Sequence, residues 1–421
     1  MPTALDRPRL RPGLAAARDE RDPFAVILFD QFRISRQLVR VTAREFTWLQ
    51  WLDGSKSLRD VQLMAMRNAG GELLPLEPLA ALVERLEEAL FLDGPRFADR
   101  LAGPVREPAC LGCYPADPAK LRALLDGYFA AAGGPRKPRE GEAPAEPRTA
   151  DDSRLGRSLT LPRRLRALLA PHIDYARGGV CYARGYKELA EHCTATVFVI
   201  VGTAHYSPAR FTLSRQDFKT PLGVVPTDQA YVDRLVAHYG DGLFDDPIAH
   251  LPEHSIELEV VFLQHLFGER PIRIVPLLVG SFADCVETGT DPAAMTDIAR
   301  MVEALRRAED ECPEPVCYII SGDLAHIGPK FGDEGPLKQP VLAESRAGDA
   351  AILKQAEAAD PDGYYRVVAA EGDRRRICGL PPTWTVLKAV RPSHGRVLDY
   401  GQHVHPRGLE SVSFASAAFY S

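Results

Sequence analysis

Histidine is absent from the start of this chain of 421 residues, and all 11 histidines lie between His172 and His405. Imidazole is the side chain that most often binds metals and moves protons near neutral pH. Any histidine-dependent chemistry is therefore expected in the later part of the chain, and the earlier part is expected to serve another purpose.

Long apolar runs and an excess of positive charge are also missing. No apolar run approaches the roughly 20 residues that span a bilayer, and the first residues lack the apolar stretch of a secretory signal. The net charge is −6, which gives no electrostatic reason to expect nucleic acid or an anionic membrane as a partner. Eight cysteines in so long a chain do not make a disulfide scaffold, so we expect a cytoplasmic protein with mostly buried free thiols.

The length predicts two or three domains. Residues 1–22 are rich in arginine and proline and are expected to be a disordered arm. Residues 23–100 combine short apolar strands with three amphipathic helices, the first two of which begin at Thr42 and Ser57. This pattern is typical of a small winged-helix-like accessory module.

DNA binding is the obvious function for such a module, but its charge argues against it. Residues 31–92 carry eight Lys or Arg and eight Asp or Glu, so no basic excess is left to neutralise phosphates. A protein-docking or accessory role is the better expectation.

The second region is expected to run from 105 to 421. Asp117 and Pro118 predict the start of a helix, and Cys110 and Cys113 precede it. A single CxxC pair without a nearby histidine is weak evidence for zinc or redox chemistry, so these cysteines are expected to be incidental. Residues 133–158 are rich in proline and charge and predict a flexible insertion.

From residue 159 onward, predicted strands and helices alternate, which favours an α/β fold with a buried, mostly parallel or mixed sheet between helical layers. The expected strands are short and strongly apolar, at 165–170, 196–202, 272–279, 316–321, 396–400 and 411–419.

Polar clusters follow three of these strands and open one helix. His172 and Asp174 follow the first strand, and His205 follows the second. Parallel strands place their carboxyl ends at one edge of a sheet, so these groups are expected to converge. The other clusters supply Glu253 with His254 at a helix start, and Asp323 with His326 after the strand that ends near 321.

Two imidazoles need a third protein ligand to hold an open metal site. The residues alone leave four alternatives: Asp174, Asp323, Glu253 and Cys378.

From about 105 onward the chain resembles the Memo family, which is protein B of the AmmeMemoRadiSam system. The resemblance rests on the order and spacing of APHIDY at 170–175, VGTAHY at 201–206, EHSIELEV at 253–260, SGDLAH at 321–326 and ICGLPP at 377–382. Residues 24–92 lie outside this resemblance.

The resemblance implies a three-layer fold like that of class III extradiol dioxygenases. It also implies an iron (Fe²⁺) or copper site formed by His172, His205 and Cys378. His326 and Asp323 would act as an acid/base pair, and Glu253 and His254 would line the same pocket. The protein would then be a metal-dependent oxidoreductase acting on a small molecule or a peptide.

Three residues depart from the family pattern, and one of them is Ile327, which follows His326 where an aromatic residue is common. Asp174 stands where the family usually has glycine, and Tyr206 stands where a second histidine is common. Asp174 is expected to reach the metal or one of its imidazoles, and both residues are candidates for the surroundings of the site.

The resemblance also implies alternatives to catalysis. The same cleft could bind a peptide or small ligand without turnover, as an adaptor would. The chain could instead be an accessory subunit, with a radical SAM protein and an AMMECR-type protein as partners that residues 24–92 help to dock.

Overall fold

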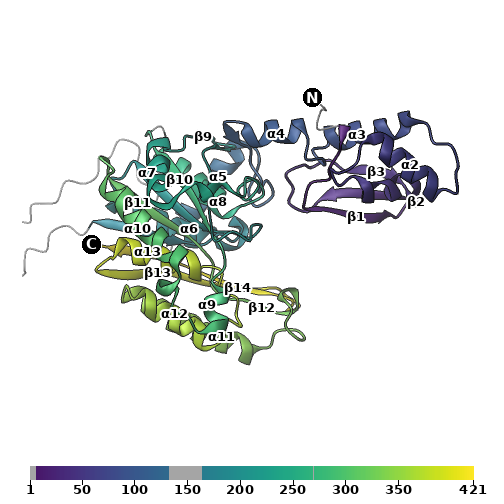
Figure 1. Ribbon diagram of the computed structural model, residues 1–421. Helices are drawn as coiled ribbons and strands as arrows, with labels where there is room; N and C mark the ends of the chain where they lie inside the picture. Colours follow the sequence, from purple (N-terminus) through teal and green to yellow (C-terminus); the bar gives the residue numbers. More distant parts are fainter. Residues whose placement is uncertain (1–5, 132–163, 269) are drawn as a thin grey trace, which may run out of the picture. The chain divides into compact units, whose positions relative to one another are not determined.

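The computed structural model describes residues 6–131, 164–268 and 270–421, and these form two compact units, Met1–Pro104 and Val105–Ser421 (Figure 1). The insertion predicted at 133–158 lies outside the described residues. Within the described ranges, no helix is both long enough and apolar enough to cross a membrane.

The first unit has a three-stranded antiparallel sheet in the order β1-β2-β3, followed by helices. Thr42 and Ser57 begin the first two helices, as the sequence pattern predicts, and each forms a reciprocal capping box. The elements are β1 (Leu14–Asp19), β2 (Asp22–Asp30), β3 (Val39–Thr42), α1 (Ala43–Trp48), α2 (Leu58–Asn68), α3 (Leu76–Glu88) and α4 (Pro95–Ala102).

The expectation of a disordered arm is wrong for residues 6–22. Residues 14–19 form β1, which pairs along the length of β2. Arg11 is buried and makes an ion pair with Asp30, 2.6 Å between nitrogen and oxygen. Backbone pairing and a buried ion pair therefore order a segment whose low apolar content suggested disorder, because neither contact needs a large side-chain core.

The second unit is built on an eight-stranded mixed sheet in the order β12-β14-β5-β11-β6-β10-β7, with β13 paired to β14. The four central strands are parallel, and the outer ones are antiparallel. The strands are β5 (Leu165–Ala170), β6 (Val197–Thr203), β7 (Phe211–Leu213), β10 (Arg273–Val279), β11 (Val316–Ser321), β12 (His326–Ile327), β13 (His394–Val404) and β14 (Ser411–Tyr420). A small separate sheet joins β4 (Val105–Arg106), β8 (Asp217–Thr220) and β9 (Gly223–Val225).

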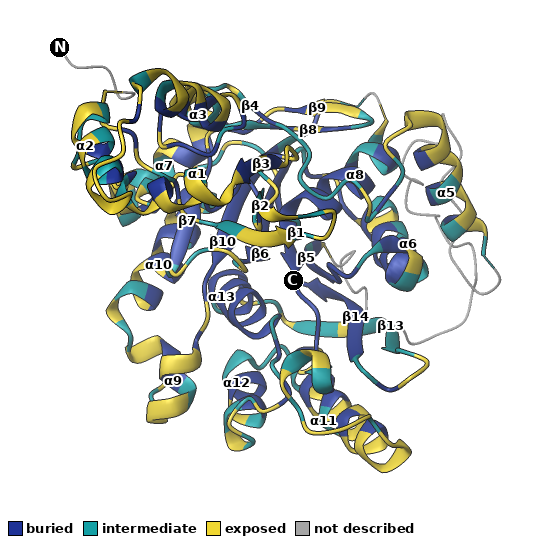
Figure 2. Cartoon of the chain, turned by 90° about the vertical axis from the view of Figure 1, so that its right-hand side faces the viewer, coloured by how far each residue is buried: buried dark blue, intermediate teal, exposed yellow. Residues whose placement is uncertain are grey.

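Helices cover both faces of this sheet, as the burial colours of Figure 2 show, with dark blue strands between helices that are yellow on their outer sides. Alternate residues of each strand enter two different apolar cores, as the period-2 geometry of a strand requires. One core includes side chains of α5 (Pro118–Ala130), α6 (Tyr175–His192) and α8 (Ser255–Phe267). The other includes those of α7 (Gln229–Tyr239), α9 (Ala283–Thr288), α10 (Thr296–Asp310), α11 (Gln339–Glu357), α12 (Pro361–Ala370) and α13 (Leu380–Val390).

The fold is thus an α/β sandwich around a mixed sheet, as predicted. The predicted strands correspond to β5, β6, β10, β11, β13 and β14, and the sequence pattern missed the short strands and helices α4, α9 and α12. Cys110 and Cys113 differ from the expectation of free thiols, because they form a disulfide. The other six cysteines are free.

Candidate metal centre

Three parallel neighbours, β5, β11 and β6, end at the same edge of the sheet. His172 follows β5 by two residues, His205 follows β6 by two, and Asp323 follows β11 by two. Their side chains therefore share one edge because of strand order alone, as the rule for open α/β sheets predicts.

Cys378 reaches this edge from a distant loop that precedes α13. Gly322 and Gly379 approach so closely that a Cβ on Gly322 would lie 2.5 Å from the Gly379 Cα. The Gly379 amide donates to the Asp323 carbonyl at 2.9 Å. This glycine-to-glycine contact seats the loop, and the Cys378 Sγ then lies 3.3 Å from His172 Nε2.

The three side chains form one cluster, in which a ligand atom each from His172, His205 and Cys378 lies within 4.8 Å of the others. Two imidazoles and a thiol make a donor set that suits iron, copper or zinc and does not suit magnesium or calcium. With only three protein donors, a bound ion would keep open positions. The donor chemistry therefore fits the metals that the resemblance implies.

Glu253 organises the second histidine. Its carboxylate lies 3.0 Å from His205 Nδ1 and accepts the backbone N–H groups of His205, His254 and Ser255. His254 Nδ1 is 3.2 Å from the same carboxylate. His205, Glu253 and His254 also form a group compact enough to hold an ion. The Glu253 carboxylate, however, already accepts the three backbone N–H groups and contacts both imidazoles. Glu253 thus orients His205, a common arrangement for metal-binding histidines.

The pKa values of His172 and His205 are shifted in opposite directions. Burial and the neighbouring His205 and His254 lower the pKa of His172 well below its ordinary value, which leaves a neutral imidazole. Burial alone would also lower the pKa of His205, but Glu253 and the Cys378 sulfur outweigh it and hold the His205 pKa well above that value. Burial raises the pKa of the Cys378 thiol, and a hydrogen bond with His205 opposes the rise. A bound cation would replace the His205 proton as the partner of the sulfur.

The expected pairing of Asp323 with His326 differs from the contacts observed. Asp323 accepts the backbone N–H of His172 at 3.0 Å, and its other oxygen is 3.9 Å from His172 Nε2. His326 Nδ1 instead lies 3.1 Å from two carbonyl oxygens, those of Leu324 and Arg376. Carbonyls accept only, so Nδ1 carries the proton and the Nε2 lone pair stays free.

Both groups have shifted pKa values. Burial lowers the pKa of His326 to about 4, so the ring is neutral at pH 7. Burial raises the pKa of Asp323 to about 7, despite the backbone N–H groups that favour its charged form. A neutral imidazole and a carboxyl that titrates near neutrality are suited to moving protons.

The structure shows the contacts of Asp174 and Tyr206, the two candidates for the surroundings of the site. Asp174 is the N-cap of α6 and accepts the backbone N–H and, at 2.6 Å, the side-chain Nε of Arg177. An N-cap role explains an aspartate at this position, and a role for Asp174 at the metal site stays a prediction. The Tyr206 ring is partly exposed and its centroid is 6.3 Å from that of His205.

Sequence reasoning missed a buried ion pair behind Glu253, formed by Arg106 and Glu257. Glu257, one turn along α8, is fully buried and accepts the backbone N–H groups of Ala109 and Cys110 and the Tyr114 hydroxyl. Arg106 makes an ion pair with Glu257 and donates to the Glu253 and His250 carbonyls. The alternation of charged and apolar residues at 253–260 gave no indication that Glu257 faces inward.

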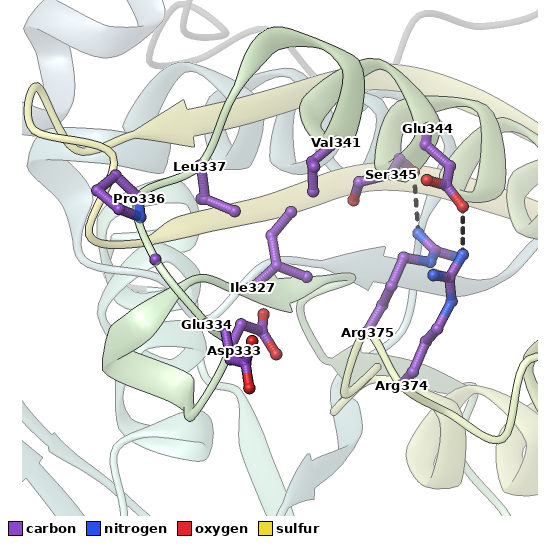
Figure 3. A pocket seen from close by; sticks show the side chains of 11 residues that line it. Ile327, Asp333, Glu334, Pro336, Leu337, Val341, Glu344, Ser345, Arg374 and Arg375 are labelled. Atoms are coloured by element: carbon purple, nitrogen blue, oxygen red, sulfur yellow. Dashed lines mark hydrogen bonds and ion pairs between the residues drawn. The ribbon is translucent and has the colours of Figure 1, made fainter.

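A cavity of about 210 Å³ lies on another part of the second unit (Figure 3). It borders Ile327, next to His326, but contains no histidine or cysteine, and its arginines are paired: Arg374 with Glu344, and Arg375 with the Ser345 carbonyl and Asp349. The cavity is thus separate from the metal-ligating cluster, with which it shares no residue.

Fold and cluster together define the second unit as an α/β protein with a candidate metal centre at the carboxyl edge of its sheet. Residues 106–418 match the family model described as Memo-like protein. The chain belongs to this family.

Relatives support the assignment. A MEMO1 family protein of Methanopyrus kandleri is 32% identical over 75% of this chain and 98% of its own length. One of Aquifex aeolicus is 25% identical over 88% and 90%, and one of Thermus thermophilus is 28% identical over 85% and 97%. A solved structure titled uncharacterized protein JW3007 from Escherichia coli K12 is similar at 16% identity over 61% of this chain and 100% of its own, with a TM-score of 0.36, too low to add to the argument.

The Aquifex and Thermus matches cover more of the chain than residues 105–421 contain. They therefore extend into the first unit, which the sequence resemblance had placed outside the family. Part of that unit is shared with these two relatives.

Proposed function

We propose that this protein is a metal-dependent oxidoreductase that holds iron or copper on His172, His205 and Cys378. The observation that carries the proposal is the convergence of the three donor atoms within 4.8 Å of one another. They come from three separate loops, and Asp323 and Glu253 position two of these loops from behind.

A bound iron or copper ion would supply redox chemistry and Lewis acidity at this edge of the sheet. The protein groups around it have separate roles. Glu253 fixes the ring of His205, and His254 stacks on that ring with centroids 4.9 Å apart. His326, neutral and with a free Nε2, is placed to accept a proton from a substrate. Asp323, with a pKa raised to about 7, is placed to store one.

The side chains around the cluster indicate the class of substrate. The ligands lie at the sheet edge, His205 and His254 are partly exposed, and the Phe331 ring is 5.2 Å from that of His326. An aromatic small molecule or a peptide side chain would pack on these rings. We therefore retain catechol-type compounds and peptides as the substrates to test.

Metal analysis tests the proposal directly. The wild-type protein, Cys378→Ala and the control Cys285→Ala would be purified without oxygen and assayed for iron and copper. Cys285 is buried in α9 away from the cluster. We expect near-stoichiometric metal in the wild type and the control, and at least a tenfold loss in Cys378→Ala. A wild type without either metal, or a variant that retains as much, contradicts the proposal.

Oxygen uptake by the iron-loaded protein with catechol-type and peptide substrates would separate turnover from binding. Retained metal with no uptake and measurable ligand binding would favour the adaptor alternative, in which the same cleft captures a ligand without changing it.

A second candidate role, docking of a partner, is favoured by the first unit. This unit has its own apolar core and no histidine. A radical SAM protein and an AMMECR-type protein are the partners to test, by pull-down with the full chain and with residues 105–421. Equal recovery by both forms contradicts a docking role for the first unit.

A further inference from the structure

Three buried hydroxyl groups lie directly behind the metal-ligating cluster: those of Thr203, Ser255 and Ser321. Thr203 and Ser321 are the last residues of β6 and β11, and Ser255 is the first residue of α8. The two serines are fully buried. Most buried hydroxyls in proteins make hydrogen bonds, and the partners of these three show the direction of each bond.

The Ser321 hydroxyl has one proton, and it is already used. Ser321 Oγ donates to the Ser255 carbonyl at 2.6 Å, and a carbonyl oxygen can only accept. The same Oγ lies 3.4 Å from His172 Nδ1. With its proton committed, the oxygen can only accept from the ring, so His172 Nδ1 must carry the imidazole proton.

The titratable group beside Ser321 is Glu259, whose carboxyl interacts with the Ser321 hydroxyl. Glu259 is fully buried, and burial raises its pKa well above the ordinary value. The Tyr186 hydroxyl donates to it at 2.6 Å. The placement of the Ser321 proton rests on its 2.6 Å hydrogen bond to the Ser255 carbonyl.

We propose that Ser321 is a positioning residue that fixes His172 as the Nδ1–H tautomer and so aims the Nε2 lone pair at the metal position beside Cys378. The inference rests on the proposed function for its purpose, but not for its geometry. The reversed tautomer would place Nε2–H against Sγ at 3.3 Å and would set the Nδ1 lone pair against the lone pairs of Ser321.

The other two hydroxyls hold this arrangement in place. Ser255 Oγ donates to the Thr203 carbonyl at 2.9 Å, which fixes the start of α8 on the end of β6. Thr203 Oγ1 donates to the Cys378 carbonyl at 2.9 Å. A single set of hydroxyls therefore ties together the strand ends, the helix start and the cysteine loop.

The tautomer can be read without any metal. In full-length, metal-free protein with ¹⁵N-labelled histidine, long-range ¹H–¹⁵N spectra distinguish Nδ1–H from Nε2–H, and His172→Gln assigns the His172 signals. We expect Nδ1–H in the wild type and a mixture or the Nε2–H form in Ser321→Ala. An Nε2–H form in the wild type, or an unchanged tautomer in Ser321→Ala, overturns the proposal.

Titration with cobalt(II) measures how the loss of the Ser321 hydroxyl changes metal affinity. The cobalt–thiolate absorption reports binding at Cys378, and loss of a group that orients a metal-binding histidine typically weakens metal affinity about 10- to 100-fold. We expect that loss in Ser321→Ala, with the thiolate band restored at high cobalt. Thr385→Val is the matched control, because the Thr385 hydroxyl is buried with no hydrogen-bond partner among the described residues. Equal losses in both variants overturn the proposal.

The two readouts also separate this inference from the proposed function. If the wild type binds no iron, copper or cobalt, the proposed function fails, and the spectra of the metal-free protein still decide whether Ser321 sets the tautomer.

Discussion

In the first unit, the buried ion pair of Arg11 and Asp30 is complete in itself: the Asp30 carboxylate accepts from the guanidinium and from the backbone N–H groups of Phe32 and Ser35. At the sheet edge of the second unit, two imidazoles, a thiol and two carboxyl groups lie close together, and His172, Glu253 and Asp323 among them are buried. Several of them have strongly shifted pKa values.

This difference distinguishes a structural ion pair from a candidate functional site. A buried pair whose partners satisfy each other needs no ligand. A buried cluster of donors and acid/base groups that mutually perturb their pKa values is typical of a functional site. The four predictions below test that contrast, beginning with the largest expected effect.

Glu257→Ala should lower the free energy of unfolding of the second unit by about 3–5 kcal/mol, because it leaves the buried Arg106 guanidinium unpaired. Urea unfolding followed by Trp384 fluorescence, with Trp48 and Trp51 replaced by phenylalanine, would report this unit alone. Glu107→Ala is the control, since its ion pair with Lys219 is exposed and should contribute at most about 1 kcal/mol. If the two variants lose the same free energy of unfolding, the buried ion pair of Arg106 and Glu257 contributes no more than an exposed one.

The pH dependence of stability should reveal Asp323 in the metal-free protein. Burial raises its pKa from 3.8 to about 7, so between these values the folded state binds more protons than the unfolded state. The free energy of unfolding therefore falls as pH rises through this window, by up to about 1.4 kcal/mol per pH unit from this group.

Asp323→Asn should remove that contribution, and thermal melting of both proteins from pH 4 to 8 would measure it. We expect the stability of the wild type to decline more steeply with pH than that of the variant up to about pH 7. Parallel curves would show that Asp323 titrates normally in the folded protein.

Glu253→Gln should weaken metal binding about 10- to 100-fold, because an amide is a weaker partner for His205 Nδ1 than a carboxylate. Titration with iron(II) under nitrogen would measure the change. Glu287→Gln, on the exposed side of α9, should leave the affinity as it is. If Glu253→Gln also binds normally, Glu253 does not orient the histidine.

Asp174→Ala should have the smallest effect, a loss of about 1 kcal/mol from the missing N-cap of α6, with the metal content unchanged. Asp174→Asn should recover most of the stability, since asparagine also caps helices well. Loss of metal in both variants would support the expectation that Asp174 serves the site.

Much of the second unit was predictable because its strands are short, apolar and bounded by turns. β5, β6 and β11 lie within a residue of their predicted bounds, and the convergence of His172 with His205 follows from parallel pairing. The ordered start of the first unit was missed because an ion pair and edge-strand pairing leave little trace in composition. The N-cap role of Asp174 was not predicted, because a helix N-cap and a metal site favour the same residue type.

The sequence by itself determined which chemical groups are present and that two histidines follow apolar strands, since parallel strands bring their carboxyl ends to one edge of a sheet. The tertiary structure decided the rest. The contact between His172 and Cys378 spans 206 residues and depends on how closely Gly322 and Gly379 pack. Whether Asp323 faces His172 or His326, and which tautomer Ser321 imposes, depends on distances of a few tenths of an ångström that no local pattern encodes.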